Sequence, residues 1–342
     1  MRYLRFFLFP LAVVYMILTS LRNLFFSIGL FKQVTYTVPT LGIGNLSTGG
    51  TGKSVAVQFF IRHFKAHYPI TVLSRGYGRV SKGFQVATAS STVTALGDEP
   101  MMFYRQHPDI RVAVSRSRRE GMKKLLDESS FAQKGLFIWD DCFQHRWVKP
   151  KTMVLLTNYF SPYTSDFLLP VGQLRELSEG AQRAQTIIVT KCPPQMGNNE
   201  KQAMEEKMQL KSYQKVFFSS IKYSERILNK ERFLSLDTLE RLSFVLVTGI
   251  AYPEPLVDYL KKKYLNFEHM AYNDHHAFSD QDVENIKTQS NGRMVLTTEK
   301  DYVRLSPKFS SELLFYLPIE MVIHDERETE LLEDVKKGLG LA

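Results

Sequence analysis

The sequence predicts an α/β protein in which a mostly parallel sheet is flanked by helices, together with a second, smaller α/β domain. Short apolar, β-branched stretches alternate mostly with longer polar or amphipathic segments, which is typical of parallel strands covered by helices. At roughly 100 to 200 residues per domain, a chain of 342 residues favours two domains. The strand-like stretches are 35–44, 70–74, 110–115, 135–141, 152–157, 186–191, 244–249 and 293–301.

An apolar segment at residues 1–32 precedes these strands. Its uncharged runs FFLFPLAVVYMIL (6–18) and LFFSIGLF (24–31) are shorter than the about 20 apolar residues of a spanning helix, and Pro10 interrupts the first. We therefore expect a membrane-contacting helix that lies in the headgroup layer. Two ordinary core helices are one alternative, and a cleaved signal peptide is another, although no A-x-A-like site follows. The basic residues that flank or interrupt the runs are Arg2, Arg5, Arg22 and Lys32.

A domain boundary is expected near residue 150, where WVKPKT separates two strand-like runs. This interpretation gives a first α/β domain at 33–150 and a second at 151–342. The polar stretch 198–215 reads as a solvated helix or an insertion within the second domain.

A glycine-rich loop, GNLSTGGTGKS at 44–54, follows the first strand-like stretch and precedes an apolar, helix-like run. Glycines let successive backbone N–H groups turn inward, and the following helix points its positive end at the same place. The loop departs from G-x-x-x-x-G-K-[ST] because Ser47 stands at the first glycine position, but its context still predicts nucleotide-phosphate binding in a P-loop NTPase-like sheet. Lys53 would reach the outer phosphates, and Ser54 would join a magnesium shell. The predicted phosphate-binding residues are Gly49, Gly50, Thr51, Gly52, Lys53 and Ser54.

Two other places in the sequence carry candidate functional carboxylates. Asp140 and Asp141 end the apolar run LFIW, where a metal ion that bridges the outer phosphates would lie; capping of a turn is the alternative. Asp98 stands in the glycine-bounded turn LGDEP before a helix-like segment. Its carboxylate either accepts the proton of an attacking hydroxyl or caps that helix, and spacing alone leaves both interpretations open.

Composition narrows the class of partner. A formal net charge of +9 favours anionic partners such as nucleic acid, phosphorylated substrates or an acidic membrane. No recognisable helix-turn-helix, RNP or zinc pattern accompanies this charge, so we expect no nucleic-acid partner. The two cysteines, Cys142 and Cys192, support neither a disulfide framework nor a structural zinc site.

The chain carries seven motifs in series: GNLSTGGTGKS (44–54), SRGYGR (74–79), LGDEP (96–100), DDCFQHR (140–146), GQLRE (172–176), NDHHAFS (273–279) and TTEKDYVRL (297–305). Together they resemble the tetraacyldisaccharide 4′-kinase family of lipid A synthesis. The family's phosphate loop departs from the strict pattern in a similar way. The resemblance implies transfer of the γ-phosphate of ATP, with Mg²⁺, to the 4′-hydroxyl of a tetraacylated glucosamine disaccharide 1-phosphate, which gives lipid IVA at the cytoplasmic face of the bacterial inner membrane. The enzyme would be peripheral or monotopic.

The resemblance also implies roles for particular residues. Asp98 and His275 match a catalytic dyad that acts with Lys53, and Asp140 and Asp141 match the metal-side pair. Residues 33–150 would be the P-loop nucleotide- and lipid-binding domain and 151–342 a lid-like domain, to which Arg175 and Glu176 would contribute over the nucleotide. The TTEKD motif receives no catalytic role. The positions expected to face the disaccharide, its phosphate or the nucleotide are Arg75, Tyr77, Arg118, Gln144 and His145.

A membrane-associated P-loop switch ATPase of the partitioning or targeting class is the alternative function. The loops of such ATPases carry a lysine before GG, whereas Thr48 occupies that place here. Dependence of ATP consumption on a lipid acceptor would separate the kinase from the switch.

Overall fold

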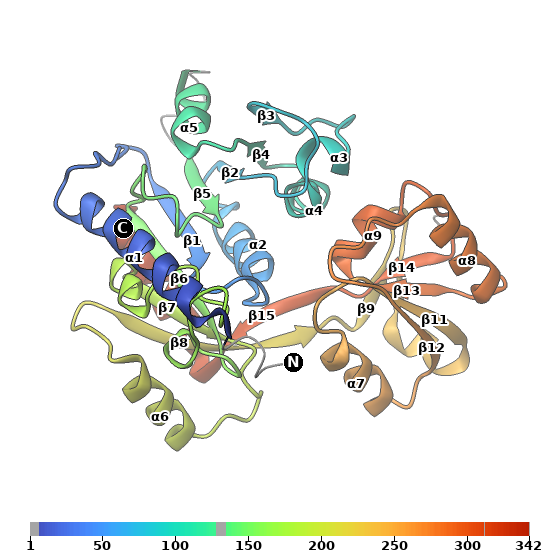
Figure 1. Cartoon of the computed structure of the whole chain (residues 1–342). Coiled ribbons are helices and arrows are strands. Elements are labelled where there is room, and N and C mark those ends of the chain that lie inside the picture. The colour runs from blue at the N-terminus through green and yellow to red at the C-terminus, as the bar shows by residue number, and fades with distance from the viewer. Residues whose placement is uncertain (1–6, 128–134, 311, 342) are drawn as a thin grey trace.

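A computed structural model describes residues 7–127, 135–310 and 312–341. In the described residues the larger domain is built on a nine-stranded sheet of order β15-β8-β7-β6-β1-β5-β2-β4-β3, which is parallel except at its two edge pairs (Figure 1). Its strands are β1 (Thr40–Asn45), β2 (Ile70–Ser74), β3 (Gln85–Val86), β4 (Arg111–Val114), β5 (Leu136–Asp140), β6 (Thr152–Asn158), β7 (Thr186–Thr190), β8 (Lys215–Tyr223) and β15 (Ile319–Ile323). The helices of this domain are α2 (Lys53–Phe64), α3 (Val93–Leu96), α4 (Asp98–Gln106), α5 (Arg118–Asp127), α6 (Asn198–Met208) and α10 (Glu328–Leu339).

The central strands are apolar on both faces because both faces are covered. Every residue of β1, β2, β5 and β7 is buried, as expected for parallel strands between two layers. One core contains the apolar side of α2, including Phe59 and Phe60, together with Leu331 from α10. The other contains Trp139 of β5 and part of α5. Each of the eight predicted stretches contains a strand, but 293–301 is a strand only at Val295–Thr297 and continues into a helix that begins at Glu299. The predicted mostly parallel α/β fold is confirmed.

The smaller domain lies beside the larger one (Figure 1) and has a six-stranded sheet, counted in the described residues, of order β10-β9-β14-β13-β11-β12. Strands β11, β12, β13 and β14 are parallel, and β9 and β10 add antiparallel pairs. The strands are β9 (Arg226–Leu228), β10 (Phe233–Ser235), β11 (Ser243–Thr248), β12 (Asn266–Ala271), β13 (Val295–Thr297) and β14 (Leu314–Tyr316). The helices are α7 (Glu254–Lys262), α8 (Asp280–Ser290) and α9 (Glu299–Leu305).

The predicted domain boundary at residue 150 is wrong. Strands β6, β7 and β8 continue the sheet that contains β1, so WVKPKT is only a connection between β5 and β6. The chain leaves the larger domain after β8 and returns through β15 and α10. Ser224 N donates to Pro318 O at 2.9 Å, which joins the two connecting segments side by side. The smaller domain therefore comprises about residues 226–316, inserted into the larger one.

Replacement of Leu331 by alanine tests this division. Leu331 lies in α10 and is fully buried against the larger sheet, so loss of its side chain should lower the unfolding free energy of that domain by about 2–5 kcal/mol. Both tryptophans, Trp139 and Trp147, belong to the larger domain, so denaturant unfolding followed by tryptophan fluorescence reports on it. The exposed neighbour Glu333 provides the control, since Glu333→Ala should leave the transition unchanged. An unchanged transition in Leu331→Ala would place α10 outside the larger domain.

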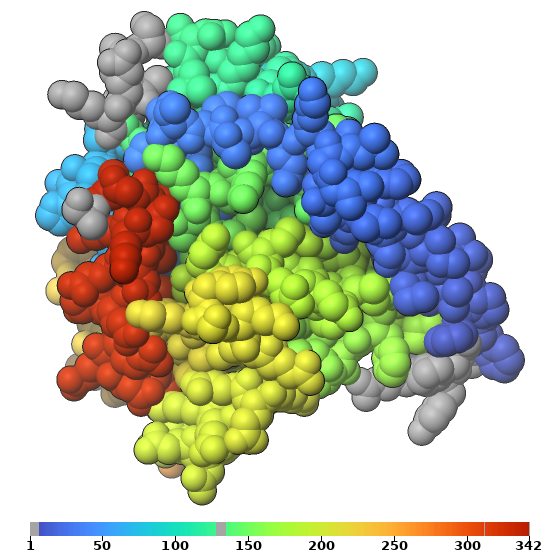
Figure 2. Space-filling model, turned by 90° about the vertical axis from the view of Figure 1, so that its left-hand side faces the viewer, coloured from blue at the N-terminus to red at the C-terminus, as the bar shows by residue number. Residues whose placement is uncertain are grey.

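The apolar N-terminal segment forms one helix, α1 (Phe9–Ser27). Pro10 does not break it because a proline in the first helical turn sacrifices no hydrogen bond. Its length and composition suffice to cross a membrane, which is weak evidence that it does. Figure 2 shows the helix lying along the surface of the larger domain. The predicted basic residues Arg2 and Arg5 lie outside the described residues.

Helix α1 has one side that contacts the larger domain and an opposite side that is apolar and exposed. Within α1 only Ala12 and Phe26 are buried, so the alternative of an ordinary core helix is wrong. Tyr15 Oη donates to Arg175 O at 2.8 Å, and Arg22 Nη2 donates to Gln144 O at 3.1 Å. One side of the helix is therefore held against the larger domain by polar contacts, while its opposite side leaves apolar side chains exposed. These side chains are Leu11, Val14, Ile17, Leu18, Leu21 and Leu24.

Candidate functional site

The glycine-rich loop connects the buried strand β1 to the N-terminus of α2. Gly49, Gly50 and Gly52 have φ values of +94°, +68° and +76°, which glycine adopts without steric cost. Gly52 is the N-cap of α2, and no side chain caps that helix end. The hydroxyl of Thr51 is buried and, among the described residues, has no hydrogen-bond partner. Free N–H groups at the positive end of a helix, beside an open glycine loop, form a site for an anion.

Lys53 begins α2 and points toward the strand ends. Its Nζ donates to Asn45 Oδ1 at 3.1 Å and lies 3.6 Å from Asp141 Oδ1. Asp141 comes near because β5 is the parallel neighbour of β1, with Ile43 opposite Asp140. The register of two strands therefore brings the predicted lysine and the predicted aspartate pair together.

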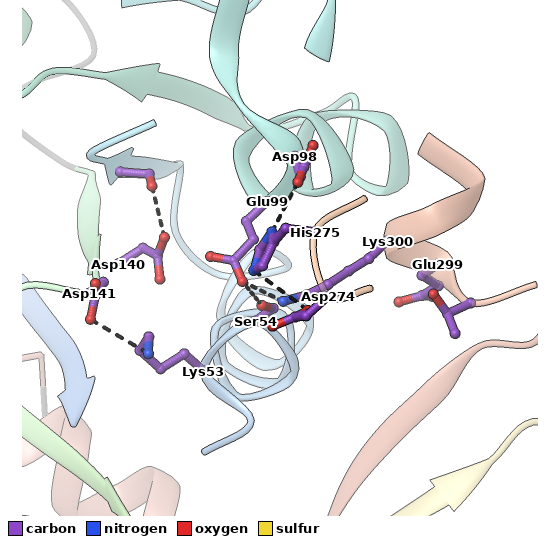
Figure 3. Close-up of polar contacts among 12 residues, drawn as sticks. Lys53, Ser54, Asp98, Glu99, Asp140, Asp141, Asp274, His275, Glu299 and Lys300 are labelled. Carbon is purple, nitrogen blue, oxygen red and sulfur yellow. Dashed lines mark hydrogen bonds and ion pairs between the residues drawn. The ribbon is translucent and has the colours of Figure 1, made fainter. Parts of the chain in front are cut away.

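The two aspartates have different environments (Figure 3). Asp140 accepts a hydrogen bond from Ser74 Oγ at 2.8 Å, while its buried Oδ1 has no partner among the described residues. Burial, followed by the negative charges of Glu99 and Asp141, raises the pKa of Asp140 to about 7. Burial would also raise the pKa of Asp141, but the charges of Lys53 and Arg175 outweigh it and hold that pKa below its usual value. The site thus contains excess carboxylate charge on its buried side.

Glu99 is a site residue that sequence reasoning missed. Its Oε1 accepts hydrogen bonds from Ser54 Oγ and from Lys300 Nζ, both at 2.6 Å. Burial would raise the pKa of Glu99, but these contacts and the charge of Lys300 lower it to about 2. The motif LGDEP contained a signal that could have identified Glu99. Two adjacent acids in the first turn of a helix point in different directions, so Asp98 and Glu99 contact different neighbours.

The predicted dyad is brought together across the domain boundary. His275 Nδ1 lies 3.3 Å from Asp98 Oδ2 and 3.0 Å from Arg304 Nη2, and Arg304 also donates to the Asp98 carboxylate. Burial would raise the pKa of Asp98, but the hydrogen bonds from His275 and Arg304 outweigh it and lower that pKa. His275 has a φ of +57°, and its N–H donates to Gly249 O at 3.1 Å. The neighbouring His276 instead pairs with Asp282 at 3.0 Å, away from Asp98.

Arg175 and Glu176 belong to the larger domain, which corrects their predicted place on a lid. Arg175 Nη1 donates to Asp141 and to Gln144 Oε1, each at 3.2 Å, and its backbone N–H donates to Leu46 O at 2.8 Å. Glu176 is almost fully buried and accepts hydrogen bonds from Asn23, Gln144 and Arg183. The GQLRE segment therefore joins the phosphate loop to α1.

The residues expected to face the substrate divide into two groups. Arg75 and Tyr77 are exposed, and the ring of Tyr77 lies 6.1 Å from that of His275. Gln144 and His145 are half-buried beside the aspartate pair, and burial, followed by the charge of Arg118, lowers the pKa of His145 to about 4. Arg118 is only 1% exposed and donates to the backbone carbonyls of Ser115 and Asp140. Arg118 was predicted to line the disaccharide, but it is buried and holds the end of β5 through its hydrogen bond to the carbonyl of Asp140.

A pocket of about 380 Å³ opens beside the glycine loop. Its lining comes from both domains, because Ala251, Tyr252 and Asp274 of the smaller domain face Gly49 and Gly50. The Tyr252 ring comes so close to Gly50 that a Cβ on Gly50 would lie 3.2 Å from it. A nucleotide phosphate chain on the loop would therefore extend between the domains.

Comparison with known proteins agrees with this geometry. A model of the family LpxK, described as tetraacyldisaccharide-1-P 4′-kinase, matches residues 4–337. The chain belongs to this family. It is 40% identical to a tetraacyldisaccharide 4′-kinase of Flavobacterium johnsoniae, with 99% of each chain covered. It is 35% identical to one of Bacteroides thetaiotaomicron, covering 96% of this chain and 91% of that protein.

The fold is likewise similar to a solved member of the tetraacyldisaccharide 4′-kinase family. The crystal structure of the "apo" form of LpxK from Aquifex aeolicus in complex with ATP aligns with a TM-score of 0.79, at 26% identity, over 98% of this chain and 99% of that one. The family resemblance inferred from the seven motifs is confirmed. The alternative of a partitioning or targeting ATPase is not favoured.

Proposed function

We propose that this chain transfers the γ-phosphate of ATP to the 4′-hydroxyl of a tetraacylated glucosamine disaccharide 1-phosphate, giving lipid IVA. The observation that carries this proposal is the position of the Asp98–His275 pair. Asp98 adjoins Glu99, whose Oε1 is 2.6 Å from Ser54 at the start of α2. A proton acceptor therefore lies close to where the outer phosphates would end, as transfer to a hydroxyl requires.

The phosphate side of the reaction uses the loop and Lys53. The backbone N–H groups of the loop from Gly49 to Ser54 would bind the triphosphate. Lys53 would leave Asp141 for the outer phosphates, where its charge would stabilise the transferring group. Arg175, which donates to the same aspartate, would contribute a second cation. The adjacent Glu176 accepts a hydrogen bond from Arg183, which would hold the segment that carries Arg175 in place.

The site fits Mg²⁺ in the manner of phosphoryl-transfer enzymes. No group of three or more His, Cys, Asp or Glu side chains in the described ranges forms a complete metal cage. Magnesium in such enzymes is instead held by one or two carboxylates together with phosphate and water oxygens. The unpartnered Oδ1 of Asp140 and the crowding that raises its pKa fit a cation there. Ser54 and at most two of the three nearby carboxylates, Asp140, Asp141 and Glu99, would hold the metal ion, which would neutralise charge on the phosphates.

At the acceptor side, the Asp98 carboxylate would take the proton of the 4′-hydroxyl as that oxygen bonds to the γ-phosphorus. His275 would orient the carboxylate and share the proton. Arg75 and Tyr77 would contact the disaccharide and its phosphate, for which an arginine fork is well suited. Gln144 and His145 would line the space between sugar and nucleotide, while Arg118 keeps the Asp140 backbone in place.

We further propose that the protein works at the cytoplasmic face of the bacterial inner membrane as a peripheral or monotopic enzyme. The acyl chains of the acceptor stay in the bilayer, so the site must reach the headgroup layer. The exposed apolar side of α1 supports this placement, because the opposite side of the same helix contacts Arg175 and Gln144.

Incubation with γ-labelled ATP, magnesium and the disaccharide 1-phosphate in detergent micelles tests the function. We expect label on the lipid, and ATP consumption only when the lipid is present. ATP hydrolysis at the same rate with and without the lipid, together with no labelling of the lipid, would contradict the kinase function and favour the switch ATPase.

Replacement of Val14 and Leu18 by glutamate tests the membrane surface. Both side chains are more than half exposed, and burial of each in a bilayer contributes about 1.5–3 kcal/mol, so the double variant should bind anionic phospholipid vesicles at least about tenfold more weakly. Tyr264→Glu changes an exposed aromatic residue of the smaller domain and should bind like the unmodified protein. Sedimentation with vesicles measures both, and equal binding of the double variant would exclude α1 as the contact surface.

A further inference from the structure

The TTEKD motif, which sequence analysis left without a catalytic role, contributes the helix that contacts the site from the smaller domain. Helix α9 packs on α4 and α2: Arg105 Nη1 donates to Ser306 Oγ at 2.8 Å, and Gln58 Nε2 donates to Glu299 Oε2 at 3.4 Å. Between these contacts, Lys300 and Arg304 stand one helical turn apart and face the adjacent acids Glu99 and Asp98. The smaller domain therefore supplies one cation to each acid.

The contact made by Lys300 lies where a metal ion would be held. One oxygen of Glu99 is 2.6 Å from both the Lys300 ammonium and the Ser54 hydroxyl (Figure 3). A serine hydroxyl and a carboxylate are oxygen ligands of the kind that Mg²⁺ takes in proteins, so Ser54 and Glu99 would both be able to hold the ion when it is bound. The ammonium thus supplies the positive charge that Glu99 would otherwise receive from the metal ion.

The other cations near the loop have different partners. Lys53 faces Asn45 and Asp141, and Arg304 is divided between Asp98 and Asp301. A metal ion at Glu99 would repel Lys300. The nearest new anion would be the outermost phosphate, toward which the long flexible lysine side chain would turn.

We propose that Lys300 takes the place of the metal ion at Glu99 while the site holds no metal nucleotide, and that it turns to the γ-phosphate when the metal ion binds. This inference rests on the proposed kinase function and adds a residue to it. Lys300 then has two opposite effects: it competes with the metal ion in the empty site and stabilises the transferring phosphate in the filled one.

Lys300→Met separates these effects. Titration of the nucleotide-free protein with Mn²⁺, followed by electron paramagnetic resonance, should show about tenfold tighter binding than in the unmodified protein, because the competing ammonium is gone. In lipid phosphorylation the same variant should lose about 10- to 100-fold in kcat, with the KM for the lipid unchanged. Lys300→Arg keeps the charge and the contact between the domains, so its Mn²⁺ binding should remain as weak as in the unmodified protein.

Lys287→Met provides the matched control. Lys287 lies on α8 of the same domain, 2.8 Å from Glu284, so its loss also removes an ion pair but should change neither measurement. Mn²⁺ binding by Lys300→Met that is no tighter than in the unmodified protein would overturn the competition, and an unchanged kcat would overturn the phosphate contact. If the unmodified protein labels no lipid, the kinase function fails instead, while the Mn²⁺ titrations still judge the contact with Glu99.

Discussion

Replacement of Asp98 by asparagine is expected to lower kcat for lipid phosphorylation by about 10²- to 10⁴-fold, the usual contribution of a positioned general base. The amide keeps the size of the side chain but cannot accept the proton of the 4′-hydroxyl. His275→Ala should cause a smaller loss, and the double variant should be little worse than Asp98→Asn, because the two side chains act as one unit. Steady-state kinetics with saturating ATP measures these values.

The protein contains a matched control for this experiment. His276 and Asp282 form a second histidine–aspartate pair at 3.0 Å, and both residues belong to the smaller domain. Asp282→Asn weakens the cap of α8, in which the carboxylate accepts from Ser279, but should leave kcat within about twofold. Equal loss in the two aspartate variants would show that any broken pair of this kind harms the fold, and a fully active Asp98→Asn would remove Asp98 from the base role.

The direction of the Asp98 pKa shift determines what Asp98 itself contributes to the pH dependence of kcat. Because His275 and Arg304 hold the pKa of Asp98 below its usual value, its carboxylate is ionised throughout pH 5–8 in the folded protein. Protonation of Asp98 therefore cannot lower kcat as the pH falls from 8 to 6.

Replacement of Lys53 by methionine is the second change with a large expected effect. Loss of a fixed charge at a developing negative charge typically costs about 10²- to 10³-fold in kcat, and we expect a loss in that range with a raised KM for ATP. The KM for the lipid should stay unchanged, because Lys53 faces Asn45 and Asp141 on the nucleotide side.

Lys65 at the other end of α2 controls for the loss of a lysine from this helix. It pairs with Asp109 at the surface, and Lys65→Met should alter neither kcat nor either KM. Isothermal titration with ATP and magnesium separates binding from catalysis in both variants. Lys53→Met that binds ATP and transfers phosphate normally would contradict the assignment of this loop as the phosphate site.

Local patterns in the sequence were sufficient for the strands and the phosphate loop. The eight apolar, β-branched stretches contain strands because both faces of the sheet are covered, so the pattern needs no information from distant residues. The glycines at 49, 50 and 52 have positive φ because glycine lacks a side chain, so the loop also depends on residue type and not on distant residues. The nearness of Asp140 to the loop was also predictable, since carboxyl ends of parallel strands share one edge of a sheet.

Partners in space required the tertiary structure. The break in composition at WVKPKT suggested a linker, but membership of a sheet depends on which strands pair. The returning strand β15 pairs with β8 although the paired residues lie 96 to 104 positions apart in the sequence. Glu99 was passed over because its partners, Ser54 and Lys300, lie 45 and 201 residues away. Arg118 differs from its expected position because it is buried and donates to the backbone carbonyls of Ser115 and Asp140, and burial is decided by the packing of the folded chain.

The sequence by itself thus determined the family, the phosphate loop and the chemistry of the side chains, because these depend on residue type and short spacing. The tertiary structure alone decided which acid meets which cation, because an ion pair forms only where folding has closed the chain between its partners. Lys300 is the clearest case. Its positive charge follows from the sequence, but it lies beside Glu99 only because the smaller domain packs on the larger one.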